Sequence, residues 1–187
     1  MIRLYMGEMF DPLNPDPKSI KAPILAHSLS NLCRYGGHCE TFYSIAQHVV
    51  LCARLIEKFY PASGEALEAL HHDDSEGLGL VDMPRPVKHA PSMLGYRQIE
   101  DKVDRAVKIA FNLKEVTRWV KWADDQLLVN EMKVLAPLSY PVYSQKLRDQ
   151  GIEEVEIEVA PWNSSTAKRI YLSTHERLTK ERNENED

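Results

Sequence analysis

Cysteine is scarce in this sequence, and glycine and proline are not abundant. The 187 residues include 3 Cys with no CxxC pair, which argues against a disulfide framework and against a zinc-finger pattern. The 8 Gly and 11 Pro are too few for a collagen-like or low-complexity chain. A small, odd number of cysteines favours a reducing compartment.

An excess of basic residues is also lacking. Lys and Arg total 23 against 28 Asp and Glu, a net charge of −5, so a general nucleic-acid partner is not expected. A small phosphorylated substrate remains compatible, because it needs only a few local cations. The first residues show no signal-peptide pattern, and no apolar run approaches the ~20 residues that span a bilayer. We therefore expect a cytoplasmic protein (in the host cytoplasm if the protein is viral) with no membrane partner.

Hydrophobic periodicity predicts an all-α fold in a single domain over residues 1–187. Residues 1–22 read as an irregular, proline-rich segment, and residues 181–187 as a charged, frayed tail. Val155, Ile157 and Val159 alternate with glutamates, which predicts a minor extended or β element near 152–159. Apolar spacing and breaker residues predict helices over residues 24–33, 42–60, 64–76, 92–113, 114–135 and 166–180.

Four polar residues fall on or beside the apolar faces of these helices: His48, His72, Asp73 and Asp124. Each alone has an ordinary explanation. His48 would be a core histidine, and the His72-Asp73 pair would be a solvated helix end. Asp124 would form a salt bridge to Arg118 or Lys121. Together they form a mixed nitrogen and oxygen set suited to a divalent transition metal such as Zn, Mn, Co, Fe or Ni. Such an ion lowers the pKa of a bound water toward ~7 and so makes hydroxide available at neutral pH.

The order His48 … His72-Asp73 … Asp124 resembles the H…HD…D pattern of the HD superfamily of metal-dependent phosphohydrolases. Neighbouring segments resemble the family too, and extend the likeness to its small single-domain bacterial and phage branch. They are residues 10–17, 27–38, 43–48, 69–76, 82–88, 122–124 and 161–169. His71 and Asp125 double a histidine and an aspartate, so the register is open to dispute; we place it on His72-Asp73 and Asp124, where both flanks align without a gap.

This resemblance implies an HD-domain helical bundle that hydrolyses a deoxynucleotide phosphate ester. Phage relatives cut dATP to deoxyadenosine and triphosphate, and bacterial relatives are deoxyribonucleoside 5′-monophosphatases. Residue by residue, Glu76 matches the glutamate that positions or deprotonates the water. Asp82 matches the acid proposed to protonate the leaving oxygen, and Arg34 matches an arginine that holds the phosphate. Lys88 would be a second phosphate contact, and the resemblance allows Mg²⁺ on the substrate phosphates.

Residues next to Arg34 complete the expected substrate site. Tyr35 offers a stacking face for a base, Gly36 and Gly37 permit close approach of a ligand, and His38 is a further candidate for phosphate contact. A dNTP triphosphohydrolase preferring dATP is the leading expectation, and a 5′-nucleotidase the alternative. A non-catalytic nucleotide sensor, or a phosphodiesterase acting on cyclic or guanosine-polyphosphate nucleotides, is less favoured. Related enzymes form homo-oligomers, so a dimer or hexamer is expected.

Overall fold

Helices build most of residues 1–186, the part of the chain that this computed structural model describes. The strands β1 (Ile2–Arg3) and β2 (Met9–Phe10) form a small antiparallel ladder with Ile2 opposite Phe10. The predicted all-α fold with a minor β element is therefore confirmed. The helices are α1 (Ala22–Asn31), α2 (Ile45–Phe59), α3 (Ala66–Leu70), α4 (Arg85–Lys88), α5 (Leu94–Ala110), α6 (Arg118–Leu135), α7 (Tyr140–Asp149) and α8 (Ser164–Glu186).

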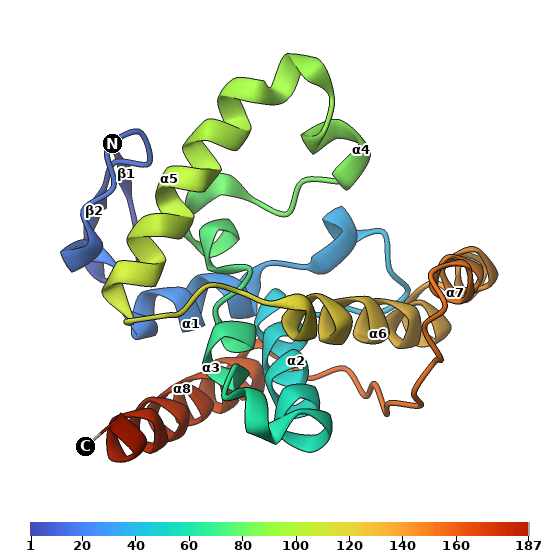
Figure 1. The fold of residues 1–187 in the computed structure, drawn as a ribbon. Coiled ribbons are helices and arrows are strands. Elements are labelled where there is room, and N and C mark those ends of the chain that lie inside the picture. Colours follow the sequence, from blue (N-terminus) through green and yellow to red (C-terminus); the bar gives the residue numbers. More distant parts are fainter. Residues whose placement is uncertain (187) are drawn as a thin grey trace.

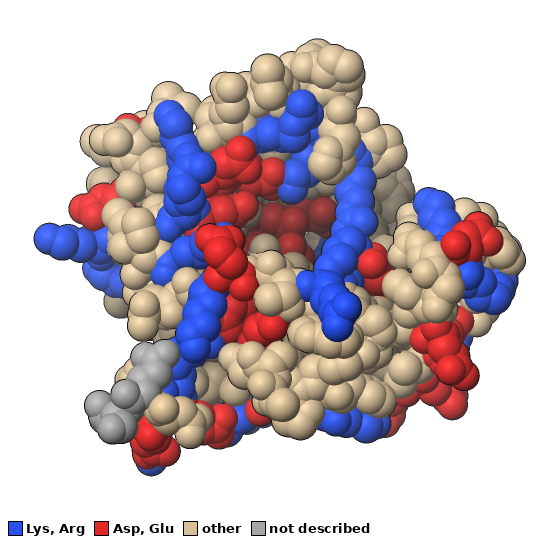
Figure 2. Space-filling view, in the orientation of Figure 1, with Lys and Arg blue, Asp and Glu red and all other residues tan. Residues whose placement is uncertain are grey.

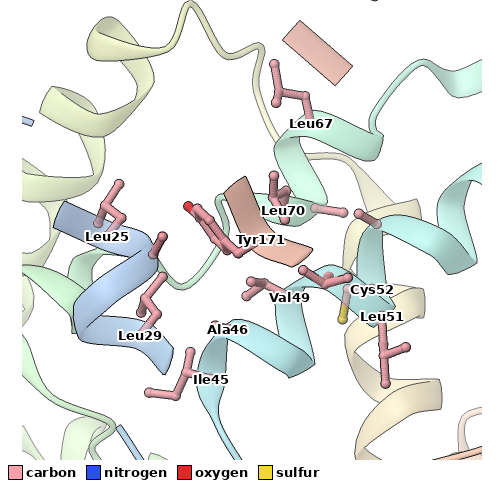
Figure 3. Close-up of a cluster of buried hydrophobic side chains, with 14 of the residues drawn as sticks. Leu25, Leu29, Ile45, Ala46, Val49, Leu51, Cys52, Leu67, Leu70 and Tyr171 are labelled. Carbon is pink, nitrogen blue, oxygen red and sulfur yellow. The ribbon is translucent and has the colours of Figure 1, made fainter. Parts of the chain in front are cut away.

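Helix α2 is the centre of the packing. It contacts α1, α3, α6 and α8, and every one of its side chains from Ile45 to Ala53 is buried. Ser44 begins the helix as an N-cap, its hydroxyl accepting a hydrogen bond from the Gln47 N–H at 3.1 Å. Figure 3 shows the resulting core, where side chains of α1, α2 and α3 converge with Tyr171 of α8. A helix buried on all sides explains why polar residues on α2 are enclosed by protein rather than solvated.

Both ends of the chain are more regular than the sequence indicates. The segment 1–22 is not wholly irregular, because it holds the β1–β2 ladder and short 3-10 turns. The expected frayed tail is also wrong over residues 181–186, which continue α8; Asp187 lies outside the described residues. Arg182 explains the continuation, since its guanidinium bonds the buried Glu68 carboxylate at 2.6 Å. Figure 1 shows α8 running beneath α2 and α3 to the C-terminus.

The predicted helix over 64–76 is broken in the structure. α3 ends at Leu70, residues 71–73 form a turn, and a π-helical turn follows over Glu76–Leu80. Helix α7 was missed altogether, because Pro137 and Pro141 read as terminators. Pro141 instead lies in the first turn of α7, where proline is tolerated because the first N–H groups of a helix have no intrahelical partner.

Residues 152–159 form the extended alternative of the predicted extended or β element, because they are not part of any strand. Side-chain amides of α6 take the place of a neighbouring strand. Gln126 bonds the carbonyl of Glu153 (2.7 Å) and the N–H of Val155 (2.8 Å). Asn130 bonds the carbonyl of Val155 (2.9 Å) and the N–H of Ile157 (3.0 Å). The alternating pattern therefore belongs to an extended segment whose backbone pairs with helix side chains instead of with another strand.

No helix among the described residues combines the length and the apolarity needed to cross a membrane.

Candidate metal centre

His48 lies fully buried near the start of α2, and the carboxylate of Glu131 fixes the orientation of its ring. Its Nδ1 lies 2.7 Å from Oε1 of Glu131, a buried residue of α6. Its Nε2 therefore points the other way, to within 3.4 Å of Asp124 Oδ1 and 3.7 Å of Asp73 Oδ2. A carboxylate behind the imidazole is the usual arrangement of a metal-bound histidine, because it fixes the tautomer and raises the basicity of the ligating nitrogen.

The turn after α3 presents His72 and Asp73 to the same space. His72 Nδ1 donates to the carbonyl of Ala69 at 2.7 Å, so its Nε2 carries the free lone pair. That Nε2 is buried, has no hydrogen-bond partner, and lies 3.4 Å from Asp73 Oδ2. The broken helix permits this, because adjacent side chains on a continuous helix diverge by about 100°.

His71 points away from this space, which decides the register of the doubled histidine geometrically. Its Nδ1 lies 2.5 Å from Asp74 Oδ2, and its Nε2 lies 3.0 Å from Nδ1 of His175 on α8. Tyr171 donates to the other Asp74 oxygen at 2.9 Å. His71 and Asp74 thus anchor the turn to α8, while the next residues face α2 and α6.

The donor atoms gathered here fit a metal ion. His48, Cys52 and His72 each offer one atom within 4.8 Å of the others and could hold an ion. An unpartnered buried imidazole nitrogen beside a second imidazole is costly unless something binds it. Cys52 is not among the four ligands predicted from the sequence, but its Sγ lies 3.6 Å from His48 Nε2.

Comparison with known proteins finds bacterial relatives whose names give no function. It is 36% identical over 137 residues to YfdR of Escherichia coli K12, described as an uncharacterized protein, covering 72% of this chain and 71% of YfdR. The chain belongs to the YfdR family. It is also 36% identical over 118 residues to an uncharacterized protein of Rhodobacter capsulatus, covering 61% of this chain and 59% of that relative. No family model matches.

In this YfdR-family site, neighbouring groups of opposite charge favour the charged forms of His48 and Asp124. Burial and Arg34 oppose a charge on His48, but Cys52, Glu131 and Asp124 outweigh them and hold the pKa of His48 well above its usual range. Burial likewise opposes the Asp124 charge, yet His48, His72 and Arg34 hold the pKa of Asp124 well below its usual range. In the absence of an ion, the proton on His48 therefore occupies the position that a cation would take.

Arg34 and its loop adjoin the donors. The buried Arg34 guanidinium lies 3.3 Å from Asp73 Oδ2 and, through Nε, 3.3 Å from Glu131 Oε2. Tyr35, Gly36 and Gly37 follow with φ values of 60°, 59° and 82°. Two of these three left-handed positions carry little steric strain, because glycine has no Cβ. Tyr35 donates its N–H to Asp82 Oδ2 at 2.9 Å and its hydroxyl to Glu131. Asp82 and Glu131 thus hold the loop from both sides.

The other predicted site residues divide into those the fold brings to the centre and those it does not. Glu76 belongs to the centre: its Oε2 is buried without a partner, and burial followed by Asp73 and Asp82 raises the pKa of Glu76 to about 9. Lys88 does not, because it pairs with Glu100 on α5. His38 is exposed and lines no part of the cavity described next.

A cavity of about 650 Å³ opens beside the donors. Arg34, Tyr35, Gly36, Asp82 and Asp124 line its inner end, while the loop 83–86 and α7 supply the outer walls. Figure 2 shows the molecule hollowed between the α4–α5 arm and α6, with acidic side chains in the depth and basic ones around the rim. The wall formed by Tyr143, Lys146 and Leu147 of α7 and by Gln150 at its C-terminal cap was missed because α7 itself was missed.

Glu131 is the other important residue that sequence reasoning missed. A pattern could have found it: Glu131 lies seven residues, two helical turns, after Asp124 and within an otherwise apolar stripe of α6. A buried carboxylate at that position requires a cationic partner.

Proposed function

We propose that this protein is a metal-dependent phosphohydrolase of the HD type that acts on deoxynucleotides. Its leading reaction is hydrolysis of a dNTP, dATP foremost, to a deoxynucleoside and triphosphate. We infer that the metal ligands are His48, His72, Asp73 and Asp124.

One observation carries this proposal. His48 Nε2 on α2 lies 3.4 Å from Asp124 Oδ1 on α6 and 3.7 Å from Asp73 Oδ2 in the 71–73 turn. The same Asp73 oxygen lies 3.4 Å from His72 Nε2 and 3.3 Å from the Arg34 guanidinium. A cation held by this set would activate water as a Lewis acid and offset the charge of a phosphate. Histidine and carboxylate ligands suit first-row divalent ions.

The surrounding residues have definable tasks. Arg34 binds phosphate oxygens in a bidentate manner, and its contacts with Asp73 and Glu131 keep the fork oriented. Glu76 keeps a proton near neutral pH because of burial and neighbouring carboxylates, so it is suited to orient water and exchange protons. Asp82 holds the Arg34 loop through the Tyr35 N–H, and the HD resemblance gives it the protonation of the leaving oxygen.

A 5′-nucleotidase acting on deoxynucleoside monophosphates is the second candidate, since it would use the same residues. The cavity volume of about 650 Å³ favours the larger substrate, because a monophosphate would leave much of it filled with water. A nucleotide sensor without turnover needs no proton-exchanging group, so the unpartnered Glu76 oxygen counts against it.

A product assay tests the proposal. Purified protein with Mn²⁺, Co²⁺ or Zn²⁺ is incubated with each dNTP and with dAMP, and the products are separated by anion exchange. Deoxynucleoside with intact triphosphate is the expected result. The Asp73→Ala variant should lose at least about 100-fold in rate, because the centre loses a ligand and the partner of Arg34.

Asp149→Ala is the matched control, since Asp149 is an exposed carboxylate on α7 outside the cavity lining and its loss should leave turnover unchanged. Release of orthophosphate from dAMP alone would replace the leading reaction by the nucleotidase. Binding of dATP without turnover under any metal would overturn the enzyme in favour of the sensor.

A further inference from the structure

The basic residues near the centre differ in what they can reach. Lys88 is paired with Glu100, and the Arg118 guanidinium lies 4.3 Å above the Trp119 ring. The basic residues that line the cavity are Arg34, Arg85 and Lys146. Arg34 is buried at the inner end, whereas the Arg85 side chain is 61% exposed.

Arg85 is attached to the candidate metal centre from outside. Its Nη2 donates to Asp124 Oδ2 at 2.9 Å, while the other oxygen of that carboxylate, Oδ1, faces His48 Nε2 at 3.4 Å. The two oxygens of Asp124 are thus divided between the metal-binding space and Arg85. Within residues 1–186, Asp124 is the one hydrogen-bond partner of this guanidinium, so its remaining N–H donors stay available.

The backbone on both sides of Arg85 is conformationally restricted. Arg85 is the first residue of α4 and lies between Pro84 and Pro86, whose rings fix φ. Across the cavity, Lys146 extends from α7, which itself packs on α6. Two cations therefore flank the outer part of the cavity, beyond the one buried at its inner end.

We propose that Arg85 binds the phosphates beyond the α-phosphate and thereby selects polyphosphate over monophosphate substrates, with Lys146 supporting it from the opposite wall. This inference rests on the proposed function. Arg34 lies closest to the metal ligands, so it serves the reacting phosphate. Arg85 is separated from the metal-binding space by the carboxylate of Asp124. In a substrate that enters through the cavity, the phosphates beyond the reacting one would lie beside Arg85. Its planar fork with several free donors suits phosphate oxygens better than a point charge does.

A purely structural role for Arg85 makes a different prediction. If Arg85 only steadied Asp124, its loss would weaken metal binding and reduce the turnover of every substrate by the same factor. An exposed ion pair contributes little to folding, so variants at Arg85 should fold. The discriminating quantity is therefore the ratio between polyphosphate and monophosphate, not activity alone.

The test compares Arg85→Gln, Arg85→Lys and the control Arg177→Gln. Arg177 is also a partly exposed arginine in a carboxylate ion pair, but on α8 and outside the cavity lining. Arg85→Gln should lower kcat/KM for dATP by about 10- to 100-fold, mainly through KM, and that for dAMP by less than about 3-fold. Arg85→Lys should recover part of the loss, and Arg177→Gln should change neither substrate.

Calorimetric titration of the metal-loaded protein gives a readout that does not depend on turnover. Arg85→Gln should weaken binding of inorganic tripolyphosphate by about 10-fold or more, while orthophosphate binding stays within about 3-fold. Equal losses for tripolyphosphate and orthophosphate, or no loss for either, would overturn the role of Arg85.

Failure of this inference differs from failure of the proposed function. Absence of turnover of every deoxynucleotide by the wild-type protein overturns the hydrolase. Wild-type turnover of dATP with an unchanged dATP to dAMP preference in Arg85→Gln overturns only the role of Arg85. Wild-type turnover of dAMP without dATP also overturns it, and leaves a nucleotidase.

Discussion

At the residue scale, Glu131 decides the charge balance of the centre. It is fully buried, and its two oxygens serve the His48 imidazole, the Arg34 guanidinium and the Tyr35 hydroxyl. Although burial opposes its charge, Arg34 and His48 hold the pKa of Glu131 below its usual value. One buried anion thus orients a metal-ligand candidate and a phosphate-binding candidate together.

Replacing this anion by a neutral isostere should weaken both functions. Glu131→Gln leaves Arg34 without its buried counter-charge and no longer raises the basicity of His48. We expect metal affinity to fall by about 10- to 100-fold, as for other partners of metal-bound histidines. Competition with a chromophoric chelator measures this fall. Metal affinity equal to the wild type would contradict the orienting role.

Cys52 offers a comparison at the same scale, because it competes with the aspartates as the third ligand. Burial raises the pKa of the Cys52 thiol, whereas His48, His72 and Arg34 hold the pKa of Asp124 well below its usual range, so Asp124 offers the more readily available anionic ligand. The aspartate set therefore requires that Cys52→Ala keep its metal in the same titration and Asp124→Asn lose it. The reverse pattern would assign the ion to the His48, Cys52 and His72 cluster.

At the element scale, the amide pairing of α6 with residues 152–160 should be a stability determinant. Asn130 is buried and bonds two backbone groups of the extended segment, so Asn130→Ala leaves a carbonyl and an N–H without partners. We expect a loss of about 1–3 kcal/mol in the free energy of unfolding and faster proteolysis of this segment. Urea unfolding measures the first, and limited proteolysis the second.

Val134→Ala is the control, because Val134 lies on the same helix but is exposed, and it should change stability by less than about 0.5 kcal/mol. Equal stability of Asn130→Ala and Val134→Ala would show that the segment is held by other contacts.

The positions of the longer helices could be predicted from the sequence, but the break after α3 and the pairing of the extended segment could not. Apolar spacing located α2, α5 and α6, because their buried stripes repeat at helical period. It missed the break after α3, where the bonds of His71 and Asp74 to α8 override helix continuation. The period of residues 152–159 could not distinguish an extended segment from a strand, because the groups that pair with this backbone are side chains of α6.

At the scale of the whole molecule, the pattern of polar residues on apolar helices brought the right neighbourhood together. His48, His72, Asp73 and Asp124 lie on three separate segments yet converge, because α2 packs against both α3 and α6. Sequence reasoning could not find the cavity walls in the same way. Nothing in the sequence distinguishes Lys146 from other surface cations, and only the packing of α7 against α6 places it in the same cavity as Arg85.

Because these residues come from separate elements, the metal binding that we propose would depend on the entire fold. An ion that joins α2, the 71–73 turn and α6 binds the folded chain and not the unfolded one, so it should stabilise folding. At a free concentration about 100 times Kd the gain is about 2.7 kcal/mol, which for a domain of this size raises Tm by roughly 5–10 °C. Calorimetric scans of the protein with Mn²⁺ and with a chelator measure the shift.

The pH dependence of this shift follows from His48. Because its pKa is raised in the metal-free folded state, its proton stabilises the fold at low pH, and that contribution is lost as pH rises through the raised value. An ion must displace the same proton, so stabilisation by Mn²⁺ should be smaller at about pH 6 than at about pH 8. Asp73→Ala should show a much reduced shift at both values. A shift that is undiminished in Asp73→Ala, or larger at the lower pH, would place the ion away from His48 and its neighbours.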